Sequence, residues 1–329
     1  MIITAASFPT PDLVKVTNNP AQWDQQEAFA KFQAAAANES LSWLNERLDA
    51  ATTRAERRAA FGELYGNLAD WRFEIAQRSG GASPDAELDQ YRRSIGPDDS
   101  RLSVFGPGLR SEGGGQIDHG ARKLTEGVPT PGSRQSVRIG EIIQARFEAE
   151  APHSDVLQNA VTLTDGQVIR GNLLLRGKAA AESRGVLFAL EGLCVTRTGT
   201  QADRRRLQQE AFDVLAGLEE RRGSELLWDP DARHAFVQAQ YFLYQGPEYE
   251  RGGDAMIRTL LVAAHARVFD QPVRMLQDVD VRAHSMGQAD FTRYAVDGYS
   301  LAPGGGSPEV SQQVPAPRPQ QRQPGVERG

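Results

Sequence analysis

The sequence predicts a mostly helical α+β protein with a small antiparallel β-hairpin region and a disordered C-terminal tail. Long stretches before residue 80 and after residue 200 carry apolar residues at helical spacing. Between them, two short runs flank Asp165-Gly166, a dipeptide typical of a hairpin turn. Residues 302–329 are rich in proline, glutamine and glycine and carry no apolar pattern, which predicts disorder.

Residues 21–301 are expected to form a single domain. A chain of 329 residues with 40% hydrophobic content is long enough for one sizeable core, and it shows no internal repeat. The first residues contain Pro9, Pro11 and Pro20 and no regular pattern. We therefore expect an irregular N-terminal segment over residues 1–20.

Composition and the N-terminus argue against several classes of protein. The formal net charge of −6 argues against a general affinity for nucleic acid. No stretch reaches the roughly 18 apolar residues of a membrane helix, so membrane insertion is not expected. The N-terminus lacks a basic segment followed by a long apolar run, which argues against a cleaved signal peptide. N-myristoylation is not expected, because Ile2 stands where that modification requires glycine. A non-cleaved export signal within residues 1–20 is compatible with this sequence.

The single cysteine, Cys194, rules out an internal disulfide framework and a cysteine-rich metal site. It lies in an apolar run, which predicts a buried structural thiol. The histidines show no recognisable metal-ligand spacing, so no metal is implied; they are His119, His153, His234, His265 and His284.

The first helical region is expected over residues 23–78. Its clearest apolar face continues one residue every three or four positions, through Phe61, Leu64, Tyr65, Leu68 and Trp71. The helix is expected to end at Gly80-Gly81.

Residues 80–135 are full of glycine, proline and serine, which predicts a loop region that is either a functional loop system or an insertion. The following stretch 144–150 alternates weakly and is assigned to a β-rich region together with the hairpin over 159–177. The apolar run over 182–197 has no clear assignment.

The last third is expected to be helical, with helices in 203–223 and 229–245, a helix after Gly252-Gly253, and a further helix before Tyr299. An aspartate, Asp229, would cap the second of these helices. The helix after the glycine pair has a buried stripe composed of Ile257, Leu260, Leu261, Ala264 and Val268. His265 lies beside that stripe and is interpreted as structural.

The segment "YERGGDAMIR" allows two interpretations. A glycine pair before a helix lets a phosphate approach free backbone N–H groups, and Arg251 would add a charge-assisted clamp. Asp254, however, is a good N-cap that would occupy the same N–H groups and repel a phosphate. The dinucleotide-binding glycine pattern and the Walker lysine are both absent, so the pattern alone favours capping.

Asp278 and Asp280 lie two positions apart, which would place both carboxylates on one face of an extended segment. Such a pair can bind a metal ion, a sugar hydroxyl or an arginine. The alternative is a solvated turn that caps a helix beginning near Arg282.

Two segments carry a family resemblance. Residues 61–78, "FGELYGNLADWRFEIAQR", show a Phe-x-x-Leu-aromatic…Ala-acidic-Trp-Arg pattern, and residues 232–294 show an arginine-glycine helix start, an alanine-rich helix, an acidic turn and a closing Phe291. "RGNLLL" and Thr130-Pro131 are weaker matches. In this order along the chain, the segments resemble the avirulence protein B effectors of plant-pathogenic bacteria, whose fold is related to the Fic/Doc ("Fido") superfamily.

The resemblance implies a Fido-like domain whose cleft contains Arg251, Asp280 and Thr130. Asp280 follows Arg251 by 29 positions (280 − 251) and Phe291 follows Asp280 by 11 (291 − 280), close to the family intervals. Arg251 and Asp280 would be the catalytic pair, with Thr130 and Asp278 as further ligand-binding residues. The family's cleft histidine has no counterpart in residues 193–215.

The function that the resemblance implies is that of an effector injected by a bacterium into the cytoplasm of a plant cell. Its cleft would hold a peptide of a host immune regulator, with a host kinase as a further partner. It would either transfer a sugar from a nucleotide-sugar or bind without turnover. AMP transfer, which needs a His-Pro-Phe-x-x-Gly-Asn-Gly-Arg loop, is disfavoured because "YQGPEYERGGDAMIR" lacks the histidine. The alternative without a functional cleft is a globular protein in which Arg251 and Asp280 form a structural ion pair.

Overall fold

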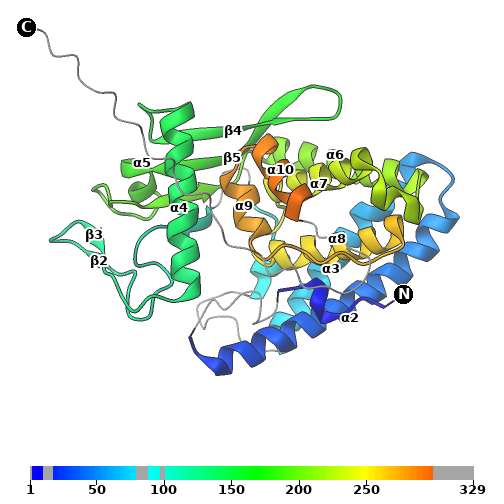
Figure 1. The fold of residues 1–329 in the computed structure, drawn as a ribbon, viewed down its shortest axis with the longest axis horizontal. Helices are drawn as coiled ribbons and strands as arrows, with labels where there is room; N and C mark the ends of the chain where they lie inside the picture. Colours follow the sequence, from blue (N-terminus) through cyan, green and yellow to red (C-terminus); the bar gives the residue numbers. More distant parts are fainter. Residues whose placement is uncertain (1, 10–17, 79–87, 97–100, 299–329) are drawn as a thin grey trace, which may run out of the picture. The chain divides into compact units, whose positions relative to one another are not determined.

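The fold is mostly helical α+β with a small antiparallel sheet, as the sequence predicts (Figure 1). A computed structural model describes residues 2–9, 18–78, 88–96 and 101–298. The tail that is expected to be disordered lies outside these residues, as does the glycine pair Gly80-Gly81. In the described part of the chain, no helix is long and apolar enough to cross a membrane.

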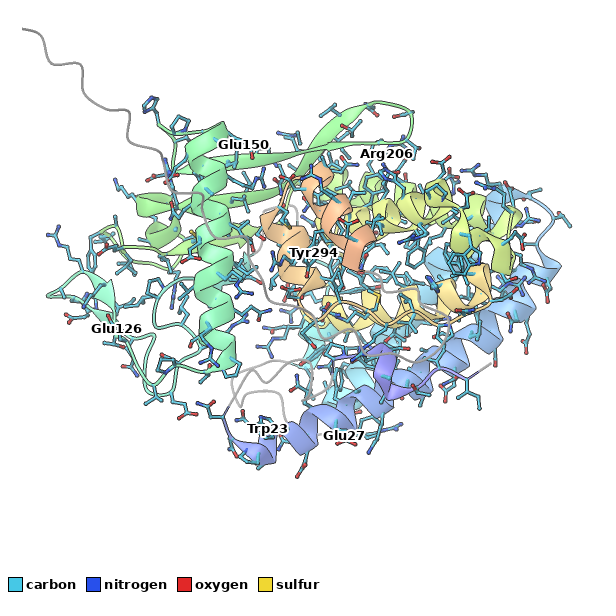
Figure 2. The ribbon with its side chains drawn as sticks, viewed as in Figure 1. Trp23, Glu27, Glu126, Glu150, Arg206 and Tyr294 are labelled. Atoms are coloured by element: carbon cyan, nitrogen blue, oxygen red, sulfur yellow. The ribbon has the colours of Figure 1, made fainter. Side chains whose placement is uncertain are left out.

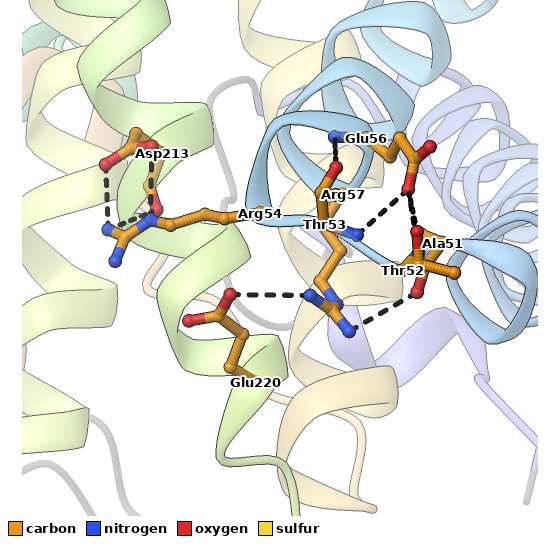
Figure 3. Close-up of polar contacts among 8 residues, drawn as sticks. All are labelled: Ala51, Thr52, Thr53, Arg54, Glu56, Arg57, Asp213 and Glu220. Atoms are coloured by element: carbon orange, nitrogen blue, oxygen red, sulfur yellow. Dashed lines mark hydrogen bonds and ion pairs between the residues drawn. The ribbon is translucent and has the colours of Figure 1, made fainter.

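The N-terminal region contains the short 3₁₀-helix η1 (Ala5–Ser7), followed by two long helices, α2 (Pro20–Ala50) and α3 (Arg54–Arg78). The predicted helical region is therefore confirmed, but it is interrupted between Ala51 and Thr53. Glu56 causes the restart, because its carboxylate accepts hydrogen bonds from the backbone N–H groups of Thr52 and Thr53, at 2.7 and 2.9 Å (Figure 3). The Thr53 hydroxyl in turn accepts from the Glu56 N–H at 3.2 Å, which completes a reciprocal cap.

Helix α3 packs against α6 (Gln201–Glu220), and two ion pairs join them at the surface. Arg54 contacts Asp213 at 2.7 Å and Arg57 contacts Glu220 at 3.4 Å (Figure 3). Exposed pairs of this kind contribute about 0–1 kcal/mol each. The packing therefore depends mainly on the buried apolar face that the sequence predicts for α3, which is complete except for the half-buried Trp71.

The sheet has the order β1-β6-β5-β4, with all neighbours antiparallel. Its strands are β1 (Arg101–Phe105), β4 (Val156–Thr162), β5 (Val168–Arg176) and β6 (Cys194–Arg197). The predicted hairpin is confirmed as β4–β5, with Thr162 opposite Val168 and Gly166 at φ +84°. Cys194 is buried as expected, and burial raises the pKa of its thiol to about 12.

The region predicted as a loop, 80–135, contains more structure than expected. Besides β1 it holds the 3₁₀-helix η2 (Leu88–Tyr91) and a two-stranded hairpin of β2 (Ile117–Asp118) and β3 (Lys123–Leu124). Strand β1 was missed because it pairs with β6, which is about 90 positions later in the chain.

The assignment of 144–150 to a β-rich region is wrong, because these residues end helix α4 (Pro131–Glu150). Ile139, Ile143 and Phe147 recur every four positions and are fully buried. They pack in one cluster with Phe105 and Leu174 of the sheet. A seven-residue window covers fewer than two such repeats, so helical spacing there resembled weak alternation.

The remaining elements are the short helix α5 (Gly177–Glu182), the 3₁₀-helix η3 (Ser224–Trp228) and four helices near the C-terminus. These are α7 (Pro230–Gln245), α8 (Gly253–Phe269), α9 (Val279–Ser285) and α10 (Gln288–Gly298). Helix α8 is buried on every side from Ala255 to Phe269. Helix α9 contacts α4, α7 and α10, so it links the sheet-side helix α4 to the helical region.

Candidate functional site

A cavity of about 770 Å³ lies at the N-terminal end of α8. Its wall comes from η2, the segment 247–252, the first turn of α8, and parts of α7, α9 and β1. Arg251 and Asp280, two of the cleft residues that the family resemblance implies, both line it. Cavities of about 300–1,000 Å³ are typical for small-molecule ligands.

The start of α8 differs from the sequence prediction. Gly252 is the N-cap residue, in the left-handed conformation at φ +77°, and makes no side-chain capping bond. Asp254 is not the cap: its carboxylate accepts from the Tyr244 hydroxyl at 2.9 Å and from Nε of Arg258 at 2.7 Å. In the described residues, no side chain therefore occupies the first N–H groups of α8, which removes one of the two objections to an anion there, while the carboxylate of Asp254 still lies in the first turn.

Arg258 is the central charged residue of the site, and the sequence interpretation missed it. Its side chain is only 1% exposed and forms ion pairs with Asp254 and with Asp280, the latter at 3.2 Å. It also donates to the carbonyls of Leu276 and Gln277 at 2.7 and 2.9 Å. Burial is the largest single effect and lowers the pKa of Arg258, but the charges of Asp254, Tyr244 and Asp280 together outweigh it, so the pKa is raised. The i,i+4 pair of Asp254 and Arg258 was the signal that could have identified it.

Asp280 lies on the first turn of α9 with its side chain 27% exposed. Burial, and next the negative charge of Asp254, raise its pKa to about 7, against the opposing effect of Arg258. A carboxylate with a pKa near the working pH suits a general base. His284 lies one turn later on α9, lines the same cavity, and has a pKa lowered by burial to about 4, so its ring is neutral at pH 7.

Arg251 lines the cavity and is half-buried. Its backbone N–H donates to the carbonyl of Gln90 at 3.1 Å, which fixes the segment before α8. Within the described ranges, its guanidinium makes no ion pair or side-chain hydrogen bond. The expected alternative of an ion pair between Arg251 and Asp280 is therefore wrong, because Asp280 pairs with Arg258 instead.

Asp278 does not face the cavity with Asp280. The segment is helical rather than extended, because α9 begins at Val279 and not near Arg282. Asp278 accepts hydrogen bonds from Nε of Arg282 at 2.9 Å and from the hydroxyl of Tyr294, the α10 residue labelled in Figure 2. These bonds turn its carboxylate toward α10.

Thr130 is not brought to the cavity wall in the described structure. Its side chain caps α4, accepting from the Ser133 N–H at 3.0 Å and donating to the carbonyl of Arg110 at 2.7 Å. Phe291 is fully buried, and its ring centroid lies 5.1 Å from that of Tyr241. The structure thus joins Arg251 and Asp280 in one cavity, leaves Thr130 and Asp278 at structural contacts, and adds Arg258, Asp254 and Tyr244.

No protein-family model matches this chain, and no curated protein matches it. The resemblance to the avirulence protein B effectors therefore stays a prediction based on the sequence motifs. In the part of the chain that the structure describes, no group of three or more histidine, cysteine, aspartate or glutamate side chains could hold a metal ion.

Proposed function

We propose that this cavity binds a nucleoside diphosphate or nucleotide-sugar and that the chain is a Fido-like glycosyltransferase. The observation that carries the proposal is Arg251, a residue that lines the cavity at the start of α8 and whose guanidinium has no ion pair among the described residues. An unpaired arginine and free helix N–H groups bind phosphate well. Asp280 in the same cavity adds an acceptor for hydroxyl groups.

The proposed reaction moves a sugar from the nucleotide to a hydroxyl group of a host protein. The acceptor oxygen attacks the anomeric carbon, and the bond between that carbon and the β-phosphate oxygen breaks. This oxygen keeps the electron pair and leaves with the nucleoside diphosphate, whose charge Arg251 offsets. Asp280 takes the proton of the acceptor hydroxyl, a role that its raised pKa favours.

The cellular setting of the proposal rests on the family resemblance. The chain would be a virulence effector that a type III secretion system delivers into the plant cell. The acceptor would be a host immune regulator whose peptide occupies the cleft, with a host kinase as a further partner. Infiltration of leaves with bacteria carrying the wild-type or the Arg251→Ala gene tests this setting; equal responses to both would contradict it.

The direct test is thermal unfolding of the full chain with a panel of nucleoside diphosphates and nucleotide-sugars. At least one should raise the melting temperature in a saturable way, and the Arg251→Ala variant should lose that response while it still folds. The control is Arg293→Ala, since Arg293 is 71% exposed on α10 and its ion-pair partner among the described residues is the nearby Asp290. A folded wild-type protein that responds to none of these ligands contradicts the proposal.

One observation favours a second candidate, a non-catalytic binding protein. Three carboxylates, those of Glu250, Asp254 and Asp280, line the cavity beside Arg251. Arg93 and Arg258 pair with these carboxylates, but carboxylate oxygens at the wall can also accept hydrogen bonds from the basic side chains of a host peptide. Mass spectrometry separates the two: a partner that gains the mass of a sugar supports the transferase, and a co-purifying partner of unchanged mass supports the binding protein.

A further inference from the structure

Two buried histidines, His265 and His284, differ in their hydrogen bonding. Burial lowers the pKa of each ring to about 4, so both rings are neutral at pH 7. Nδ1 of His265 lies 2.6 Å from the carbonyl oxygen of Gln271, so this ring has a partner within the protein. Nδ1 of His284 is buried and has no hydrogen-bond partner in the described structure, and His284 lines the cavity. His284 is therefore not a satisfied structural histidine of the kind that His265 is.

The position of His284 is fixed from two sides, although Nδ1 of its ring lacks a partner. Its backbone carbonyl accepts from Nδ2 of Asn172 in β5 at 2.7 Å. The preceding carbonyl, that of Ala283, accepts from Nε2 of Gln245 in α7 at 2.7 Å. The imidazole lies edge-on to the ring of Tyr244, with the ring centroids 6.0 Å apart and the planes at 84°. These contacts hold the imidazole at the cavity wall without using Nδ1.

The charges beside His284 exclude a phosphate as its partner. Asp280 lies four positions earlier on α9, so the two side chains are neighbours on one face of the helix. The charge of Asp254 opposes the effect of burial on the pKa of His284, which places that carboxylate close to the ring. Arg258 pairs with both carboxylates, so no positive charge is left there for a phosphate. The part of a ligand that meets His284 should therefore be uncharged.

A hydroxyl group fits a neutral imidazole, because each of them donates one hydrogen bond and can accept another. In the proposed reaction Asp280 takes the proton of the acceptor hydroxyl, which attacks the anomeric carbon of the sugar. The sugar must then lie near the cavity wall that α9 forms, and His284 is one turn along the same face. A buried polar atom without a partner costs free energy, and a sugar hydroxyl that supplies the partner removes this cost.

We propose that His284 forms a hydrogen bond with a hydroxyl group of the transferred sugar, so that the cavity selects a nucleotide-sugar over the nucleoside diphosphate alone. This inference rests on the proposed function and names the part of the ligand that α9 recognises. Arg251 contacts the diphosphate in both ligands. The loss of the imidazole should therefore weaken binding of the nucleotide-sugar and leave binding of the diphosphate unchanged.

The test compares calorimetric titrations of the full chain with UDP-glucose, UDP-galactose, GDP-mannose and GDP-fucose against those with UDP and GDP. Wild-type protein should bind at least one nucleotide-sugar about fivefold more tightly than its own diphosphate, as expected for one hydrogen bond. His284→Phe keeps a flat ring against Tyr244 but removes both nitrogens. It should reduce this ratio to about twofold or less and leave the diphosphate affinity within about twofold of wild type.

Two further variants separate hydrogen bonding from packing. His284→Gln keeps a donor and an acceptor on the side chain and should restore part of the preference for the nucleotide-sugar. The matched control is His265→Gln, which removes the other buried histidine and should leave the ratio unchanged.

A measurement on wild-type protein keeps the test valid if His284→Phe does not fold. With ¹⁵N-labelled histidine, the ring nitrogen signals of His284 should shift when the nucleotide-sugar is added and shift less when only the diphosphate is added. Identical spectra of His284 in the two complexes would overturn its contact with the sugar.

The outcomes separate this inference from the proposed function. If UDP or GDP binds but no nucleotide-sugar binds more tightly, or if folded His284→Phe keeps the ratio, the role of His284 is overturned and the diphosphate site at Arg251 stands. If folded wild-type protein binds none of these ligands, the proposed function fails and the role of His284 fails with it.

Discussion

Nη2 of Arg258, a residue with 1% of its side chain exposed, donates a hydrogen bond of 3.2 Å to Oδ1 of Asp280 at the cavity wall. The same guanidinium holds Asp254 at 2.7 Å, so one buried cation compensates two carboxylates. This arrangement separates the roles of the two arginines near α8. Arg258 neutralises the acids, and Arg251 is left to face a ligand.

Replacing Arg258 with methionine should destabilise the protein strongly. The substitution leaves two carboxylates without their cation, and losing one partner of a buried pair costs about 3–5 kcal/mol. The free energy of unfolding in urea at pH 7 measures the loss. The control Arg293→Met removes an exposed arginine and should change stability by no more than about 0.5 kcal/mol. Equal stabilities of the two variants would refute the structural role of Arg258.

Because of Asp280, we expect the stability of the protein to fall as pH rises. An ordinary salt-bridged aspartate has the opposite effect. Its pKa is raised from 3.8 to about 7 in the folded protein, so the folded state retains a proton that the unfolded state releases. Stability is therefore lost as pH rises from about 4 to about 7. Because solvent reaches part of this side chain, we expect no more than about 2 kcal/mol. The free energy of unfolding of Asp280→Asn, relative to that of wild type, should increase from pH 4.5 to pH 7.5. A difference that stays constant over this range would contradict the raised pKa of Asp280.

His265, which lies outside the cavity, should make the protein less stable as pH falls. It is 3% exposed, Nδ1 lies 2.6 Å from the carbonyl oxygen of Gln271, and burial lowers its pKa from 6.5 to about 4. Folding therefore favours the neutral ring, and stability is lost as pH falls from about 6.5 toward 4. The expected loss between pH 7 and pH 5 is about 2 kcal/mol. Urea unfolding measures this loss. Between pH 7 and pH 5, the free energy of unfolding of His265→Gln should fall by about 2 kcal/mol less than that of wild type.

Asn172 should affect the cavity from a distance. It is fully buried in β5, its Nδ2 donates to the carbonyl of His284 at 2.7 Å, and its Oδ1 accepts from Asn159. Asn172→Ala should cost about 2–4 kcal/mol, because partners within a buried network are left unsatisfied. It should also weaken ligand binding, because α9 carries both His284 and Asp280. The control is Arg170→Ala on the same strand, whose side chain is 65% exposed.

Thr130 should contribute to stability and not to binding. Its hydroxyl caps α4 and contacts the carbonyl of Arg110, so Thr130→Ala should cost about 1 kcal/mol. Ligand affinity should stay within twofold of wild type. A tenfold loss of affinity in the folded variant would restore Thr130 to the site that the family resemblance gives it.

The sequence predicts the helices well where an apolar face extends over several turns. Helices α6 and α7 repeat their buried positions three or more times, which makes their helical periodicity clear, whereas α8 is buried on every side and is indicated by its long apolar run. The last seven residues of α4 span fewer than two helical turns, so their spacing does not by itself distinguish a helix from a strand. Strand β1 has no local signal, since its pairing partner is β6.

Only part of the candidate site could be predicted, because contacts between residues that are distant in the sequence leave no local pattern. Arg251 and Asp280 were selected by a motif and their spacing, and both line the cavity. The pairing of Arg258 with Asp280 connects residues 22 positions apart on two helices, and no periodicity within one element indicates it. The sequence predicts Asp254 as the cap because it does not reveal that Gly252, in the left-handed conformation, is the N-cap at which α8 begins.

The most direct test of the central claim is calorimetric titration of four folded proteins with a nucleoside diphosphate: wild type, Arg251→Ala, Asp280→Asn and Arg293→Ala. The account predicts saturable binding by wild type and by Arg293→Ala, and binding weakened at least tenfold in Arg251→Ala. Asp280→Asn should retain binding of the diphosphate, because its carboxylate serves the acceptor hydroxyl. Binding that is unchanged in Arg251→Ala, or absent from folded wild-type protein, would contradict the account.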